Sequence, residues 1–156
     1  MTEPPARIAD GIEIRRAGAA DATAIADVYL AAFAATYDFP LAHTDEEVRG
    51  WLSEHVVDRL ETWVADDGGR VVAMMVLDDA GIDQLYVEPA WQGRGVGGRL
   101  VELAKASQPT GLELYTFQVN ERARRFYEHH GFVVAALGDG SGNEERQPDV
   151  LYRWQP

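Results

Sequence analysis

The sequence predicts an α/β (α+β) fold in a single domain, with a central mixed, mostly antiparallel sheet of about seven strands flanked by about four helices. Two observations indicate this fold. Strand-like and helix-like segments follow one another in mixed order along the whole chain. The 156 residues suffice for one substantial core, and no internal repeat or linker divides them. We therefore expect a flexible tail over residues 1–10 and one domain over residues 11–156.

The first half of the domain is expected to contain a strand, two helices and a hairpin. Residues 12–15 alternate between apolar and charged side chains, which is typical of a half-buried strand. A first helix is expected after Asp21, which can cap it, because apolar side chains then recur at helical spacing. Thr44 and Glu47 have the spacing of a capping box and predict the start of a second helix. Two strands joined by a turn follow, at residues 62–65 and 70–77.

The second half is expected to alternate strands and helices. A strand over residues 82–87 leads into a glycine-rich loop at residues 92–98 and an amphipathic helix. After a further strand over residues 112–119, Asn120 can cap the next helix and Gly131 can end it in the left-handed conformation. The last expected strands form a pair, at residues 132–137 and 150–154.

The composition excludes several classes of protein. A hydrophobic content of 46% and a charged content of 26% are typical of a soluble globular protein. The chain has no cysteine, and its four histidines show no metal-ligand spacing, so we expect neither a disulfide nor a metal. The formal net charge of −12 argues against a nucleic-acid partner and is compatible with a cationic one. No run approaches the roughly 18 apolar residues of a membrane span, so we expect a cytoplasmic protein without a membrane partner.

The glycine-rich loop at residues 92–98 is the most informative segment of the chain. Glycine allows the backbone to adopt positive φ and to approach a ligand closely. A strand, a glycine loop and a helix N-terminus in succession present backbone N–H groups to an anion. The loop therefore predicts a binding site for a phosphate or pyrophosphate group.

Two common phosphate-binding motifs fit this loop poorly. A P-loop requires Lys and then Ser or Thr after its last glycine, where this chain has Arg99 and Leu100. Gly93, Gly95 and Gly98 match the dinucleotide-binding pattern G-x-G-x-x-G, but that pattern follows the first strand of a doubly wound domain. Here the chain after the loop is too short for such a domain, and the position about 20 residues past Gly98, where an acidic residue is expected, is Gln118.

Two segments closely resemble motifs of the GCN5-related N-acetyltransferase (GNAT) family. The acyl-CoA loop of that family, Q/R-x-x-G-x-G/A after a strand that ends in V-x-P, is matched by Gln92, Gly95 and Gly97. The motif N-x-x-A-x-x-L/F-Y-x-x-x-G-F is matched by residues 120–132. Both stand in the family's order and near the C-terminus, which makes the pair far more specific than either motif alone.

The resemblance implies acetyl-CoA as cosubstrate, central strands that are splayed to form its cleft, and the homodimers that are frequent in the family. The resemblance also implies a bulge at the end of the fourth strand, near Val87. A backbone N–H there would donate to the thioester oxygen, on which negative charge develops. Gln92 either contacts a phosphate or sets the conformation of the loop. Asn120 contacts the pantetheine or a bound water, caps the next helix, or does both. The cofactor-binding residues that it implies are Tyr86, Val87, Gln92, Gly93, Arg94, Gly95, Val96, Gly97, Gly98, Asn120, Ala123 and Tyr127.

Two side chains are candidates for proton transfer. The resemblance implies Tyr127 as the acid, and a phenol with a pKa of about 10 can protonate a thiolate while remaining neutral at pH 7. The alternative is that Tyr127 is only a core aromatic residue. Asp83 is the candidate base, with Glu88 second, although an Asp beside a turn is commonly a solvated cap. Strand alternation groups Asp83 with Leu85 and Val87 but does not say which face lines a cleft.

The resemblance implies an enzyme that transfers an acetyl group from acetyl-CoA to a primary amine by direct attack. We favour a small-molecule acceptor, and residues 37–43, which follow the first helix, as part of its pocket. A protein or peptide N-terminus or lysine is the alternative acceptor. A non-catalytic acyl-CoA-binding sensor is the alternative from a different class of function.

Overall fold

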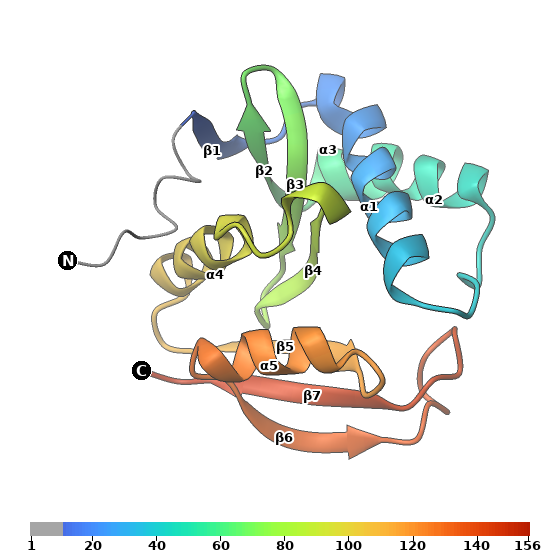
Figure 1. Cartoon of the computed structure of the whole chain (residues 1–156), viewed down its shortest axis with the longest axis vertical. Coiled ribbons are helices and arrows are strands. Elements are labelled where there is room, and N and C mark those ends of the chain that lie inside the picture. Colours follow the sequence, from blue (N-terminus) through green and yellow to red (C-terminus); the bar gives the residue numbers. More distant parts are fainter. Residues whose placement is uncertain (1–10) are drawn as a thin grey trace.

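The computed structural model describes residues 11–156, so the tail expected over residues 1–10 lies outside the described residues. Over residues 11–156 the strands form two antiparallel sheets, of order β1-β2-β3-β4 and β5-β7-β6, with helices packed on their faces (Figure 1). The predicted α+β fold is confirmed, but its strands form two sheets instead of one. The strands are β1 (Ile12–Arg16), β2 (Glu61–Asp67), β3 (Arg70–Leu77), β4 (Ile82–Val87), β5 (Leu112–Phe117), β6 (Val133–Gly138) and β7 (Asp149–Trp154).

The helices follow the predicted order along the chain, with one irregularity. The capping box is confirmed, because Thr44 Oγ1 accepts a hydrogen bond from the Glu47 N–H and Glu47 Oε1 accepts one from the Thr44 N–H, at 3.2 and 2.9 Å. The helix that it starts is not regular, since the π-helix η3 (Leu52–Val56) joins α2 to α3. The α-helices are α1 (Ala22–Thr36), α2 (Asp45–Trp51), α3 (Val57–Arg59), α4 (Val96–Ser107) and α5 (Glu121–His129).

Asp21 is the N-cap residue of α1, as predicted, but its side chain accepts no hydrogen bond from the first turn of that helix. Its carboxylate accepts a hydrogen bond from the Gly18 N–H at 2.8 Å and closes the short 3-10 turn that precedes α1. The same carboxylate accepts from Arg15 at 2.9 Å, and Arg15 also pairs with Asp66 at 3.0 Å. Hydrogen bonding from Arg15 lowers the pKa of Asp21 below its usual range. Asp21 therefore ties the start of α1 to β1 and β2.

The two sheets meet at a single backbone bridge. Gly81, just before β4, pairs in parallel with Glu113 of β5, and over the described residues no other pairing joins these two strands. Gly81 has a φ of 152°, and a Cβ there would lie 2.3 Å from the Glu113 carbonyl oxygen. Only glycine permits this approach. Beyond the bridge β4 and β5 diverge, as the resemblance implied for the central strands.

A β-bulge interrupts the start of β4. Gln84 pairs with Val76 and Ile82 pairs with Leu77, which leaves Asp83 without a partner on β3. A bulge inserts one residue and breaks the alternation of side chains. The expected grouping of Asp83 with Leu85 and Val87 therefore does not hold, although the ladder from Gln84 to Val87 is regular.

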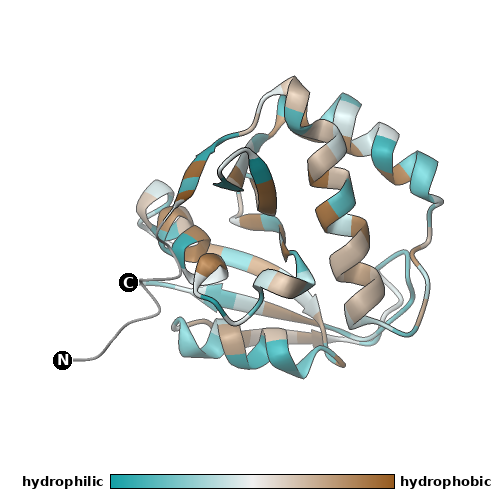
Figure 2. Cartoon of the chain, turned by 45° about the horizontal axis from the view of Figure 1, so that its top comes forward, coloured by the Kyte–Doolittle hydropathy of each residue, from teal (hydrophilic) through white to brown (hydrophobic). Residues whose placement is uncertain are grey.

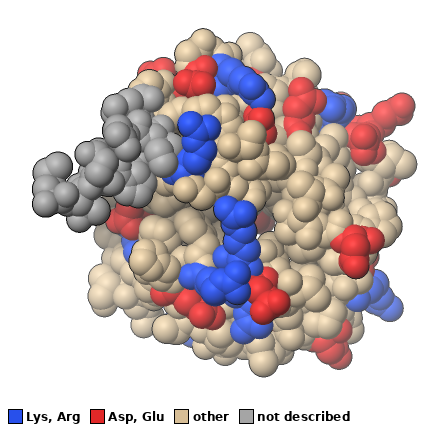
Figure 3. Space-filling model, viewed as in Figure 1, with Lys and Arg blue, Asp and Glu red and all other residues tan. Residues whose placement is uncertain are grey.

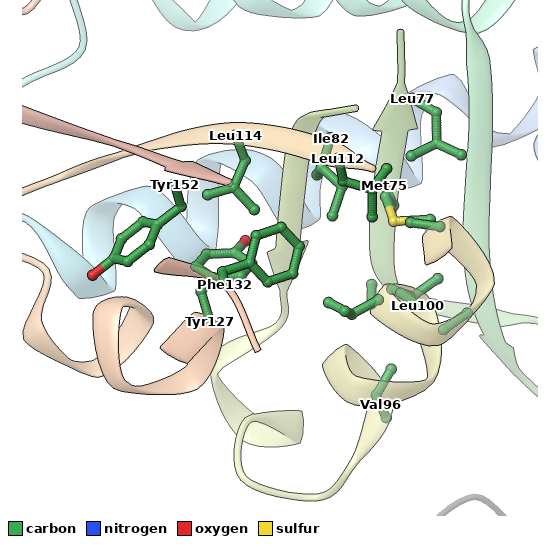
Figure 4. Close-up of a cluster of buried hydrophobic side chains, with 14 of the residues drawn as sticks. Met75, Leu77, Ile82, Val96, Leu100, Leu112, Leu114, Tyr127, Phe132 and Tyr152 are labelled. Carbon is green, nitrogen blue, oxygen red and sulfur yellow. The ribbon is translucent and has the colours of Figure 1, made fainter. Parts of the chain in front are cut away.

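Two buried cores lie on opposite faces of the first sheet. Met75 and Leu77 belong to the core shared with α4 and the second sheet, whereas Met74 and Val76 belong to the core under α1 and α2. Figure 4 shows the first core, in which side chains of both sheets meet those of α4 and α5. Because this core spans both sheets, it fixes the angle at which they diverge.

Helix α1 packs against β3 and β4, with Ile25, Val28 and Phe33 on its buried side. Figure 2 shows how densely apolar residues occur along it. The segment Ala19–Thr36 has a mean hydropathy of 1.2 and is long and apolar enough to cross a membrane by length and composition alone, which the sequence reading did not anticipate. Of this segment 33% is buried, on the side that packs against β3 and β4.

Replacing Gly81 by Ala is expected to destabilise the protein by about 2–4 kcal/mol, because a Cβ would overlap the Glu113 backbone and force the two sheets apart. Urea denaturation followed by far-UV circular dichroism measures the change. Gly50→Ala is the matched control, since Gly50 lies in α2 with no atom within 4 Å of an added Cβ. Equal stability of the two variants would contradict the role of the bridge.

Candidate active site

The diverging strands β4 and β5 border an open cleft of about 1600 Å³. Its walls come from α1, β4, the glycine-rich loop, β5, α5 and the loop between β6 and β7. Figure 1 shows α1 and α5 on different sides of the opening. The cleft therefore has two ends, one at the glycine-rich loop and one between α1 and the second sheet.

The glycine-rich loop delivers the N-terminus of α4 to one end of the cleft. Gly93 and Gly95 have φ values of 76° and 87°, and Gly95 is the N-cap residue of α4. The N–H groups of the first helical turn have no partner within a helix and are available to an anion. A Cβ on Gly97 would lie 3.2 Å from Phe126, and one on Gly98 would lie 3.3 Å from His130. Glycine here allows the loop to pack tightly against α5.

Positive charge gathers near this loop in a protein that is acidic overall. Arg122 of α5 lies beside Gly93, and the Arg94 guanidinium stacks over the Trp91 ring at 4.0 Å. Figure 3 shows blue side chains in the middle of this face of the molecule. The side chain of Val96 is buried in the core, so only its backbone N–H is open to a ligand. Together these groups suit a pyrophosphate.

The free edge of β4 offers backbone donors further into the cleft. The Glu88 N–H donates to the Val72 carbonyl, and N–H groups alternate between the two edges of an antiparallel strand. The N–H groups of Leu85 and Val87 therefore point away from β3, toward β5. The Gln92 side-chain amide donates to the Val87 carbonyl at 3.1 Å, which fixes the loop to the strand. The bulge expected near Val87 lies at Asp83 instead, so the free Val87 N–H results from its position at a sheet edge.

Four tyrosines meet at the middle of the cleft: Tyr29 and Tyr37 from the α1 side, Tyr86 from β4 and Tyr127 from α5. Burial raises the pKa of each hydroxyl, to about 12 for Tyr29. The pKa of Tyr86 is raised further by the other three, which places the hydroxyls close together. The rings of Tyr29 and Tyr86 have centroids 4.6 Å apart, so the Tyr86 side chain lies on the α1 side of β4.

Tyr127 combines a buried ring with a free hydroxyl. Its side chain is 8% exposed and packs against Phe132 and Tyr152, as Figure 4 shows. Among residues 11–156 no group forms a hydrogen bond with its hydroxyl, and Tyr127 lines the cleft together with Ala123. Both interpretations of Tyr127 are thus compatible with the structure, because the ring is in the core and the hydroxyl reaches the cleft.

Asn120 connects the two ends of the cleft. Its Oδ1 accepts a hydrogen bond from the Ala123 N–H at 3.0 Å, which confirms it as the cap of α5. Its Nδ2 donates to the Tyr37 hydroxyl at 2.9 Å. Asn120 therefore positions Tyr37, a contact between residues far apart in sequence that no local pattern indicates.

The two candidate bases lie in different surroundings. Glu88 pairs with Arg70 and does not line the cleft. Asp83 lies on the exposed rim of the cleft, where crowding by protein atoms and the nearby Asp78 carboxylate raise its pKa. Asp83 also contributes to the raised pKa of Tyr29, so the bulge brings it near the tyrosines. Of the two, Asp83 is the better placed.

Two loops meet at the far end of the cleft, and only the segment after α1 was expected there from the sequence. The Ala42 N–H donates to Glu145 Oε2 at 3.0 Å, and His43 Nε2 lies 2.7 Å from Glu144 Oε2. These bonds join the segment after α1 to the β6–β7 loop, and we call them the strap. Among the described residues no cluster of His, Cys, Asp or Glu could hold a metal ion.

The chain belongs to the GNAT acetyltransferase family. Residues 58–134 match the acetyltransferase (GNAT) domain. The peptidyl-lysine N-acetyltransferase YjaB of Salmonella typhimurium is 32% identical over 132 residues, which cover 82% of this chain and 88% of that protein. Other relatives are longer: the chain spans 56% of an N-acetyltransferase relative from Mycobacterium tuberculosis and 36% of mycothiol acetyltransferase from Beutenbergia cavernae.

Solved structures share the fold. The apo form of YjaB from Escherichia coli has a TM-score of 0.77 and 26% identity, and the match covers 92% of this chain and 97% of that one. The PaiA N-acetyltransferase of Thermoplasma acidophilum, solved in complex with coenzyme A, has a TM-score of 0.70 over 93% of this chain and 99% of that one. At 18% identity, the likeness to PaiA concerns the fold alone.

Replacing Gly95 by Asp is expected to weaken coenzyme A binding by at least about tenfold, because a side chain strains a positive φ and its charge repels phosphate. Calorimetric titration with coenzyme A measures the affinity. Gly50→Asp adds the same charge far from the loop and is expected to bind normally. Normal affinity of a folded Gly95→Asp variant would show that the loop is not the phosphate site.

Proposed function

We propose that this protein transfers an acetyl group from acetyl-CoA to a primary amine by direct attack, without a covalent enzyme intermediate. The observation that supports this most is the unpaired Tyr127 hydroxyl, which opens into the same cleft as the glycine-rich loop. One cleft thus offers a phosphate site, free backbone donors on β4 and a proton donor. Acetyl-CoA supplies the activated acetyl thioester.

Each group in the cleft has a separate role in binding or in proton transfer. N–H groups at the start of α4, with Arg122 beside them, hold the pyrophosphate. The Val87 N–H donates to the thioester oxygen, where negative charge develops as the amine attacks. The amine nitrogen bonds to the acetyl carbon while the carbon–sulfur bond breaks. The nitrogen gives up its extra proton to Asp83, and Tyr127 donates its own proton to the departing sulfur.

Two other functions remain as alternatives. The similarity to a peptidyl-lysine N-acetyltransferase favours a protein or peptide acceptor, whereas the aromatic and acidic side chains at the far end of the cleft lead us to favour a small amine. A sensor would bind acetyl-CoA without turnover, but it would have no need of a buried, unpaired Tyr127 hydroxyl. We further propose that the protein acts in the cytoplasm and that it forms a homodimer.

The proposal is tested by mixing the purified protein with acetyl-CoA and a panel of small amines and lysine peptides and following thiol release. Release that depends on an amine supports an acetyltransferase, and the active amine names the acceptor class. Binding of acetyl-CoA by calorimetry without any release would favour the sensor. Absence of acetyl-CoA binding would contradict the proposed function altogether.

Replacing Tyr127 by Phe is expected to lower kcat at least about tenfold and leave coenzyme A affinity nearly unchanged, because only the proton donor is lost. Steady-state kinetics and calorimetry measure the two quantities. Tyr152→Phe is the matched control, since Tyr152 is fully buried, does not line the cleft and donates its hydroxyl hydrogen to Glu128. An unchanged kcat in Tyr127→Phe would remove Tyr127 from the acid role.

The pH dependence of kcat/KM is expected to show an acid limb set by Asp83. A base acts only when it is deprotonated, and the pKa of Asp83 is raised, so activity should rise with pH through a value above that of an ordinary Asp. Asp83→Asn should lower the plateau and abolish this limb, and Glu88→Gln should leave it in place. A pH–rate profile of each variant measures both effects, and an intact limb in Asp83→Asn would assign the base elsewhere.

A further inference from the structure

Charge is distributed unevenly along the cleft. Arg122 is the one Lys or Arg in the lining formed by the described residues, and it lies at the glycine-rich loop. The far end is lined by Asp83, Asp139, Glu145 and Asp149. Asp139 accepts from Ser141 and Asp149 accepts from Asn143, so neither is neutralised by a cation. The far end therefore favours a cation and repels a carboxylate.

Two of these carboxylates, together with Glu144 outside the lining, act at one point. Glu145, Asp83 and Glu144 each raise the pKa of the Tyr29 hydroxyl, with Glu145 the strongest of the three. The Tyr29 side chain is only 8% exposed and lines the cleft. An ammonium group close to this hydroxyl would lie near Asp83 and Glu145 and beside Tyr86, whose ring centroid is 4.6 Å from that of Tyr29.

An aromatic wall stands next to the carboxylates. The Tyr37 ring lies 4.7 Å from Phe33, 4.9 Å from Phe39 and 5.3 Å from Phe117, measured between centroids. The hydrogen bond from Asn120 holds Tyr37 in this group. Such a wall offers contacts to an apolar or aromatic body and cation–π attraction to an ammonium group.

The strap holds Glu145 at the far end of the cleft. Its two bonds, Ala42 to Glu145 and His43 to Glu144, connect the loops on either side of the far end. Glu145 lines the cleft, so the strap fixes the position of one of the carboxylates that an ammonium group would meet.

From these observations we infer that the acceptor is a small primary amine that carries an aromatic body and no carboxylate, with Glu145 paired to its ammonium group and Tyr37 and Phe117 against its body. The inference rests on the proposed acetyl transfer and adds the class of acceptor. It separates arylalkylamines from the amino acids that differ from them by a single carboxylate.

Matched pairs of acceptors test the inference. 2-Phenylethylamine is compared with phenylalanine, and tyramine with tyrosine, by thiol release and by calorimetric titration into the coenzyme A-loaded protein. We expect kcat/KM and affinity to be at least about tenfold higher for each amine, because the carboxylate meets like charge. Hexylamine, spermidine and a lysine peptide test the aromatic preference, and each is expected to be poorer than 2-phenylethylamine.

Two variants separate the charge from the strap. Glu145→Gln removes the charge, while its amide oxygen can still accept from the Ala42 N–H. Its matched control, Glu144→Gln, likewise keeps an acceptor for His43 but lies outside the cleft lining. We expect Glu145→Gln to lower kcat/KM for 2-phenylethylamine about tenfold, and Glu144→Gln to change it less than about twofold. Phe117→Leu should abolish the preference for 2-phenylethylamine over hexylamine.

The outcomes distinguish the inference from the function that it extends. Turnover of phenylalanine, spermidine or the peptide at least as good as that of 2-phenylethylamine would overturn the acceptor class and leave acetyl transfer intact. Equal effects of Glu145→Gln and Glu144→Gln would remove Glu145 from recognition. If nothing is turned over, the titrations decide, because amines that bind no better than their amino acids overturn the inference. Absence of acetyl-CoA binding would instead remove the proposed function.

Discussion

The structure depends on the close approach of Gly81 to Glu113. At this bridge the backbones of the two sheets pair, and beyond it β4 and β5 do not pair with each other. An unpaired strand edge inside a protein is usually a liability, since its N–H and C=O groups need hydrogen bonds. Here the unpaired edge of β4 becomes the floor of a cleft, and its N–H groups become donors for a ligand. The core shared by both sheets maintains the opening.

The divergence creates two chemical environments in one cleft. At the glycine-rich loop, backbone N–H groups and Arg122 favour a polyanion, although the protein carries a formal net charge of −12. At the other end, carboxylates and aromatic rings favour a cation with an apolar body. The four tyrosines lie where these environments meet, and their hydroxyls stay protonated at neutral pH because burial raises their pKa values. Neutral phenols can donate hydrogen bonds there without adding charge to either end.

The sequence predicted what local patterns determine. The glycine-rich loop, the capping box at Thr44, the cap at Asn120 and the positive φ of Gly131 all follow from residues within a few positions of one another. Contacts that join distant segments were not predictable in this way. The bulge at Asp83 arises from its pairing with β3, and the bond from Asn120 to Tyr37 joins residues 83 positions apart. Tyr29 had the spacing of a core residue, and nothing local indicated that its hydroxyl would reach the cleft. The split into two sheets likewise depends on which strands pair, which alternation alone does not specify.

The two bonds of Asn120 connect the two ends of the cleft. One bond fixes the first turn of α5, whose residues face the glycine-rich loop, and the other fixes Tyr37 in the aromatic wall. A ligand that moved the start of α5 would therefore also act on Tyr37 through Asn120. Such coupling is reciprocal, since each ligand must strengthen the binding of the other by the same factor. The amide of a single side chain thus connects the two ends of the cleft, and any coupling through it would be the same whichever cosubstrate enters first.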